Sequence, residues 1–163
     1  MPTYNNPEKH GFAQMCSIDM NSHFKPPWKI HSFGWVSMGW KTGSAQISRN
    51  EFEEWFCELA ESERSNFIKE YPESPWWPNY YRFIEIGCGL GPRDKIPDEM
   101  IEIMKSVKVN QEFYAKEVYD KAVVLENDLN FEKAETLYSE ILQNYGNYKD
   151  TSLRCKEIRS KNV

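Results

Sequence analysis

The composition of the chain changes abruptly near residue 96, and this change limits what the chain can fold into. Of the 24 Phe, Trp and Tyr residues in the 163-residue chain, 17 lie before residue 96, together with all six Trp and eight of the nine Pro. The remainder is rich in Lys, Glu and Leu and holds a single Gly. The contrast predicts an aromatic-rich α+β segment over residues 1–96, followed by a helical segment over residues 97–163. The two segments are either separate units or parts of one continuous domain.

Three stretches of the first segment have the composition of strands. Ala13–Met20 alternates roughly between apolar and polar residues, and Ile30–Trp40 and Tyr80–Cys88 are rich in aromatic and β-favouring residues. Between the first two, Lys25–Trp28 contains two prolines, which lack the N–H that a sheet requires, and is predicted to be a loop. We therefore expect a small, mainly antiparallel sheet.

An amphipathic helix is expected to pack on this sheet. Ser48 and Glu51 have the spacing of a capping box, which predicts a helix that begins near Arg49. Four large apolar residues follow at helical spacing and predict one buried face: Phe52, Trp55, Phe56 and Leu59. The opposite face is acidic, and its carboxylates are predicted to contact a partner: Glu54, Glu58 and Glu61.

The second segment is expected to form an α-helical hairpin or bundle. Its apolar periodicity predicts helices at about 97–107, 110–127, 131–144 and 149–160. Asn110 and Asn130 are the candidate N-caps of the middle pair.

Part of this segment resembles a known repeat family. The apolar and small residues from about Ala115 to Gly146 have most of the spacing of one tetratricopeptide unit: Val118, Ala122, Leu125, Phe131, Ala134, Tyr138 and Ile141. Lys121, Leu129 and Gly146 depart from that pattern. The resemblance implies a pair of antiparallel helices, and a peptide-binding groove only where at least three such units stack.

A glycine-rich motif follows the third predicted strand. Phe83–Gly91 reads FIEIGCGLG and resembles the first motif of Rossmann-type methyltransferases, in which a strand leads into a turn that approaches S-adenosylmethionine. The helix that should follow is interrupted by Pro92 and Pro97, and too few residues remain for a parallel sheet. We expect the glycines to provide unusual backbone angles at the end of a strand.

The residue types used in catalysis and metal binding are scattered. The three histidines lie within the first 31 residues without paired spacing, so no metal site is predicted. The four cysteines, Cys16, Cys57, Cys88 and Cys155, lie at least 30 residues apart and are predicted to be buried free thiols. No nucleophile with an adjacent base is evident, so neither catalytic residues nor a cofactor is predicted.

A proline-stiffened aromatic segment supplies a second candidate contact. Ser74–Tyr81 contains Trp76, Trp77 and Tyr80, and such residues are typical of interface hot spots when they are exposed. The alternative is that the segment folds back and completes the core.

Charge and elimination together favour a binding protein. The net charge of −5 and the lack of a basic segment argue against nucleic acid as a partner. No signal-like start or membrane-spanning apolar run is evident, which predicts a cytoplasmic location. The first hypothesis is a non-enzymatic inhibitor or immunity-type factor that neutralises a basic partner such as a toxin. The second is a tetratricopeptide-like adaptor, and the third is a small S-adenosylmethionine-dependent methyltransferase.

Overall fold

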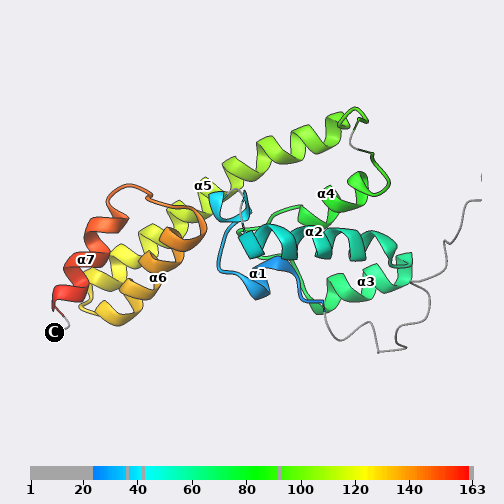
Figure 1. Ribbon diagram of the computed structural model, residues 1–163. Helices are drawn as coiled ribbons and strands as arrows, with labels where there is room; N and C mark the ends of the chain where they lie inside the picture. Colours follow the sequence, from blue (N-terminus) through cyan, green and yellow to red (C-terminus); the bar gives the residue numbers. More distant parts are fainter. Residues whose placement is uncertain (1–23, 36, 42, 92, 162–163) are drawn as a thin grey trace, which may run out of the picture.

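The computed structural model describes residues 24–35, 37–41, 43–91 and 93–161. All of the regular secondary structure in these residues is helical (Figure 1). The α+β prediction is therefore wrong, because the described residues contain no strand. The helices are α1 (Pro27–Ile30), the 3₁₀ helix η2 (Met38–Lys41), α2 (Gly43–Glu58), α3 (Glu61–Glu70), α4 (Tyr80–Gly87), α5 (Asp98–Asn127), α6 (Phe131–Asn144) and α7 (Thr151–Lys161).

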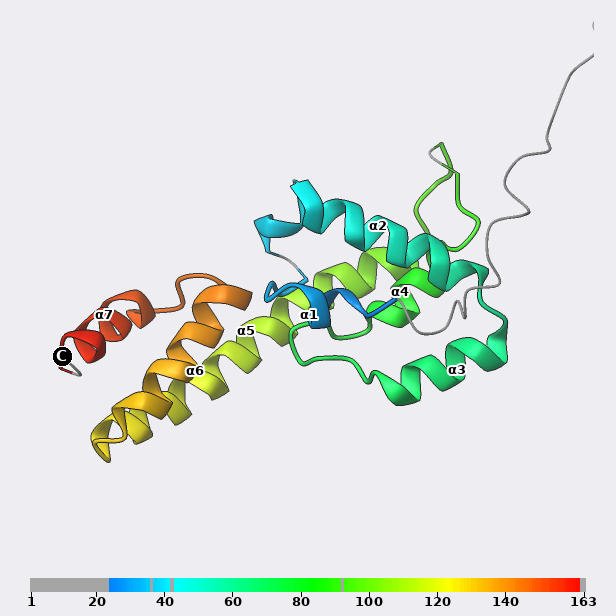
Figure 2. The same cartoon turned by 60° about the horizontal axis from the view of Figure 1, so that its bottom comes forward.

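Helix α5 organises the molecule. It runs through most of the length of the fold in both views, and α1 to α4 lie on one side of its first half, where α4 packs against it (Figures 1 and 2). Helix α6 packs along its second half, and α7 packs on α6 at the end that carries the C-terminus. The N-terminal group and the C-terminal helices therefore share one long helix.

The two predicted strands that lie within the described residues are replaced by other structure. Ile30–Trp40 contains the last residue of α1, a loop and most of η2, and Tyr80–Cys88 forms α4 and its C-cap. The segment predicted as a loop, Lys25–Trp28, contains the start of α1. Ala13–Met20 lies outside the described residues.

A distant carboxylate explains why Tyr80–Gly87 is helical. Glu73 accepts hydrogen bonds from the backbone N–H groups of Asn79 at 2.7 Å and Tyr81 at 2.8 Å. These donors at the start of a helix have no partner within the helix itself. Glu73 thus supplies a cap from outside the segment.

The predicted apolar face of α2 is buried, but against helices. Phe52, Trp55 and Phe56 are in the core, and their rings contact the ring of Phe67 on α3. The start predicted near Arg49 is wrong, because α2 begins six residues earlier, and Ser48 therefore lies inside the helix and not at its N-cap. Leu59 follows the end of α2 and is half-buried.

The C-terminal helices agree with the sequence in part. Helix α6 spans the predicted range 131–144, and α7 starts two residues later than predicted. The predicted pair 97–107 and 110–127 is one continuous 30-residue helix, α5, and Asn110 is an exposed residue in its interior.

Trp76 joins the N-terminal group to α5 and α6. Its indole Nε1 donates to Glu140 on α6 at 2.9 Å, and its ring packs edge-on against Tyr114 on α5. Its backbone carbonyl accepts from the side-chain amide of Gln111, which is fully buried on α5, and from the N–H of Trp35 at 3.1 Å. This one residue therefore contacts both parts of the fold.

A disulfide links α2 to the end of α4. Cys57 and Cys88 are bonded, with their Cα atoms 5.4 Å apart, so the prediction of free thiols is wrong for both. Cys155 is free and buried, as predicted, and Cys16 lies outside the described residues. The bond fixes the last turn of α2 against the loop that follows α4.

None of the helices in the described residues combines the length and the apolar character that a membrane span requires.

Candidate interaction groove

A groove lies between α2 and the first half of α5, with α4 as its floor. Two adjoining cavities of about 580 and 360 Å³ form it, and Phe83, Leu90 and Met100 line both. We call it the α2–α5 groove. Its remaining residues are Glu53, Glu54, Cys57 and Glu58 on α2, Ile84 and Gly87 on α4, Cys88, Gly89 and Ile96 in the connecting loop, and Ile101, Met104 and Lys105 on α5.

The loop and the α5 wall expose large apolar side chains to solvent. Leu90 is 40 % exposed, Ile96 58 %, Ile101 39 % and Met104 54 %. All four line one contiguous hollow. Contiguous exposed apolar surface of this kind marks binding sites in soluble proteins, whereas scattered exposed residues do not.

The α2 wall is acidic, and part of its charge is uncompensated. Glu54 and Glu58 lie one helical turn apart, are exposed and line the groove. Neither side-chain carboxylate forms an ion pair or hydrogen bond with another described residue. Glu61, the third predicted carboxylate, is exposed at the start of α3 and does not line the groove. The structure thus brings two of the three predicted carboxylates to one site.

Glu53 is the third groove carboxylate, and unlike Glu54 and Glu58 it has partners within the protein. The hydroxyl of Tyr80 donates to it at 2.8 Å, and the Arg49 Nε lies 3.4 Å from the same oxygen. Burial raises the pKa of Glu53 above its ordinary value, although Tyr80 and Arg49 both act to lower it. Burial and the neighbouring Glu53 raise the pKa of Tyr80, which therefore stays protonated as the donor.

The aromatic residues predicted as partner contacts belong to the core. Trp76 is 4 % exposed, and Trp77 and Tyr80 are fully buried, so the exposure that a partner contact would require of them is absent from this structure. Trp77 packs against Trp28, Trp35 and Trp40. Its indole donates to the carbonyl of Phe33 at 2.9 Å. The alternative weighed from the sequence, that the segment completes the core, is confirmed.

The glycine-rich motif contributes to the groove but lacks the strand of a Rossmann site. Phe83 to Gly87 are the end of α4, and Glu85 lies on that helix, 3.9 Å from Arg82. Gly89 has a φ of 83°, a left-handed conformation that glycine adopts without strain. The motif turns the chain out of α4 and places Leu90 at the groove.

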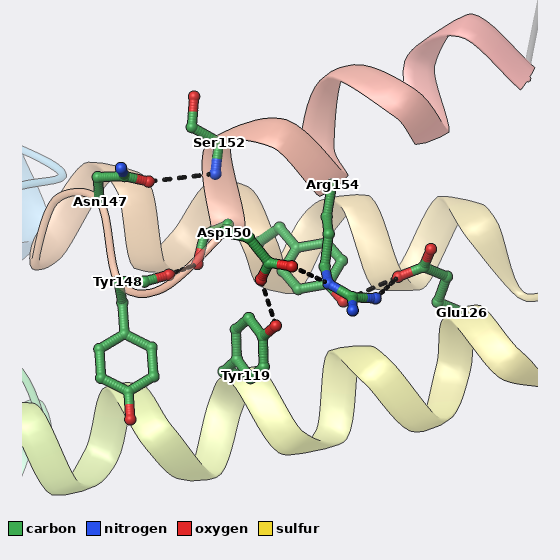
Figure 3. A network of polar contacts seen from close by, with 9 residues as sticks. Tyr119, Glu126, Asn147, Tyr148, Asp150, Ser152 and Arg154 are labelled. Atoms are coloured by element: carbon green, nitrogen blue, oxygen red, sulfur yellow. Dashed lines mark hydrogen bonds and ion pairs between the residues drawn. The ribbon is translucent and has the colours of Figure 1, made fainter.

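A second polar cluster joins the C-terminal helices (Figure 3). Arg154 on α7 donates to Asp150 at 3.0 Å and to Glu126 on α5 at 2.8 Å. Tyr119 donates to the other oxygen of Asp150, and Tyr138 on α6 donates to Glu126 at 3.0 Å. The bond from Tyr119 and the charge of Arg154 hold the pKa of Asp150 below its usual range. Each carboxylate already has its partners, which is typical of a structural network that fastens α7 to α5 and α6.

No group of three or more His, Cys, Asp and Glu side chains within the described residues is arranged to hold a metal ion. His31 packs against the rings of Phe33 and Trp40. His10 and His23 lie outside the described residues.

The apolar side of the groove was not predicted, although a signal was present. Near the start of α5, apolar residues cover more of the helix surface than the one face that would pack on a core: Met100, Ile101, Ile103 and Met104. Ile103 enters the core, and Ile101 and Met104 stay exposed at the groove. An overly wide apolar arc is thus the sequence signal of a second contact.

No protein-family model matches the chain, and no curated protein or solved structure matches it either. The function is therefore argued from the site alone.

Proposed function

We propose that the protein is a non-enzymatic binding protein that holds a basic partner protein at the α2–α5 groove. The observation that carries this proposal is the pair of unpartnered carboxylates, Glu54 and Glu58, beside a contiguous exposed apolar surface. Within this class, the proposal in its specific form is an inhibitor or immunity-type factor that neutralises a basic toxin.

The two sides of the groove support different parts of such binding. Apolar surface around Leu90 and Met104 supplies affinity, because its burial removes it from water. The carboxylates of α2 attract a basic surface over a distance and raise the association rate. A net charge of −5 on the whole chain acts in the same direction.

The other two hypotheses have less support. A tetratricopeptide-like adaptor stays a prediction, and its candidate helices, the second half of α5 with α6 and α7, are joined by the Arg154 network. The methyltransferase hypothesis depended on a strand before the glycine-rich turn, and α4 occupies that position.

The cytoplasmic location also stays a prediction. The Cys57–Cys88 disulfide counts against it, because structural disulfides are typical of oxidising compartments and rare in the cytosol.

The test compares the association rates of two charge-reversed variants with a partner isolated by pull-down. Glu54→Lys/Glu58→Lys changes the groove, and Glu51→Lys/Glu61→Lys makes the same change in charge at exposed positions outside it. At low salt we expect the groove variant to associate about tenfold more slowly and the control to change much less. The difference should shrink at physiological salt, because screening weakens the attraction. Equal rates for the two variants at low salt would refute the proposal.

A further inference from the structure

The α2–α5 groove has a shape and a charge distribution that restrict what part of a partner enters it. Its two cavities share Phe83, Leu90 and Met100, so the apolar surface is continuous along the groove. An occupant must therefore offer a continuous apolar stripe, and a single protruding side chain would leave most of this surface in water.

The unpaired charge of the groove lies on its α2 wall. On α2, Glu54 and Glu58 have no partner among the described residues. On α5, the ammonium of Lys105 lies 2.8 Å from Glu102, so the charge of that wall is largely balanced within the helix. An occupant therefore needs positive charge along one flank of its apolar stripe.

The kinds of secondary structure that commonly dock on proteins are not equally suited to this site. An extended peptide that adds a strand needs a sheet edge, and the described residues contain no strand. A polyproline segment needs a groove lined by aromatic rings, whereas Phe83 is the single aromatic residue among the described residues that line this one. Met100 and Met104 offer flexible thioether side chains, which adapt to the aliphatic ridges of a helix.

We infer that the α2–α5 groove binds an amphipathic α-helix of the partner, with its apolar stripe on α4 and α5 and its Lys or Arg residues against Glu54 and Glu58. The inference rests on the proposed function and specifies which secondary structure of the partner enters the groove. A second copy of this chain is a poorer occupant, because its net charge of −5 would be repelled by the acidic wall.

The test uses designed 18-residue peptides and the full chain. The first peptide is a helix with Leu at positions i, i+3, i+4 and i+7 and Lys along one flank of that stripe. The second replaces its Lys with Glu, and the third has the same composition in an order without a stripe. Fluorescence anisotropy at low salt should show the first peptide binding at least about tenfold more tightly than either of the others.

Two variants of α5 show whether the peptide occupies the groove. Met104→Gln alters the groove, and Val109→Gln alters an exposed apolar residue, 66 % exposed, that does not line it. We expect Met104→Gln to weaken binding of the first peptide about fivefold or more, and Val109→Gln to leave it unchanged. Circular dichroism should show both variants folded, since both positions are exposed.

The outcomes separate the inference from the proposed function. Failure of the first peptide to bind, or binding that Met104→Gln leaves unchanged, overturns the helical occupant. If binding of the isolated partner still depends on Glu54 and Glu58, the proposed function stands without the helical occupant. A dimer of the chain whose formation Met104→Gln abolishes would instead assign the groove to a second copy.

Discussion

At the scale of single residues, Glu53 is the groove carboxylate with the most specific environment. It accepts from the hydroxyl of Tyr80 and pairs with Arg49, yet burial raises its pKa above the ordinary value of 4.5. The folded state thus binds a proton at Glu53 more tightly than the unfolded state does. Ionised Glu53 therefore lowers stability, and this effect appears as the pH rises from the ordinary pKa through the raised one.

Glu53→Gln should remove this dependence. Glutamine keeps a side-chain oxygen that can accept from Tyr80, and it carries no charge. We expect the variant to match the wild type below pH 4 and to become more stable than the wild type as the pH rises to 7. Urea unfolding of both proteins across this range measures the difference. A difference that stays constant with pH would show that burial does not perturb Glu53.

Residues also show where sequence reasoning reaches its limit. Trp76 and Trp77 could be selected from the sequence, but their burial depends on Trp28, Trp35, Trp40 and Glu140. Those partners come from separate segments, so no local pattern indicates them. The exposure of Glu54 and Glu58 could be predicted, because helical spacing alone places them on the face of the helix opposite Phe52 and Phe56.

At the scale of elements, α5 differs most from its prediction. A break at Asn110 was predicted because asparagine is a favourable N-cap, and the structure places this residue in the middle of a continuous helix. An Asn in a helix interior is less favourable than Ala by about 0.5 kcal/mol.

Asn110→Ala therefore has an effect whose sign tests the continuity of α5. In a continuous helix, the substitution should raise the free energy of unfolding by about 0.5 kcal/mol. If Asn110 were an N-cap, the substitution would lower the free energy of unfolding by about 1 kcal/mol. Urea unfolding distinguishes the two, with Lys108→Ala as the control, because Lys108 is exposed on the same helix and Lys and Ala differ little in helix propensity.

The prediction of a strand at Tyr80–Cys88 is wrong because the segment is too short for its sequence pattern to distinguish a strand from a helix. Its nine residues fit both an alternating pattern and a helical one, since Tyr80, Phe83, Ile84 and Gly87 have helical spacing. The cap from Glu73, six and eight residues away from the N–H groups it accepts, favours the helix. Helix α6 was predicted correctly because its 14 residues are long enough for the helical period to dominate.

At the scale of the whole molecule, the Cys57–Cys88 disulfide stabilises the fold by restricting the unfolded chain. The bond closes a sequence separation of 31 residues that contains α3 and α4. Closing a loop of this size in the unfolded state is worth about 2–4 kcal/mol. The rings of Phe56 and Tyr81 also stack across α2 and α4, so we expect the reduced protein to stay folded.

Cys57→Ser/Cys88→Ser should lower the free energy of unfolding by about 2–4 kcal/mol. Reduction of the wild type should give a similar loss, and the reductant should leave the double variant unchanged. Urea unfolding with and without reductant makes both comparisons. A loss below about 0.5 kcal/mol would mean that the bond does not restrict the unfolded chain.

The continuity of α5 has a mechanical consequence. Its first half forms one wall of the groove, and its second half packs on α6 and is bonded to α7 through Glu126 and Arg154. Between the two halves, Gln111 donates a hydrogen bond to the backbone carbonyl of Trp76. A helix of 30 residues is about 45 Å long, and Trp76 is bonded to it near its middle. Because the groove wall and the surface that holds α6 belong to this one rigid element, we expect a tilt of α5 to change the width of the groove and the position of the C-terminal helices together.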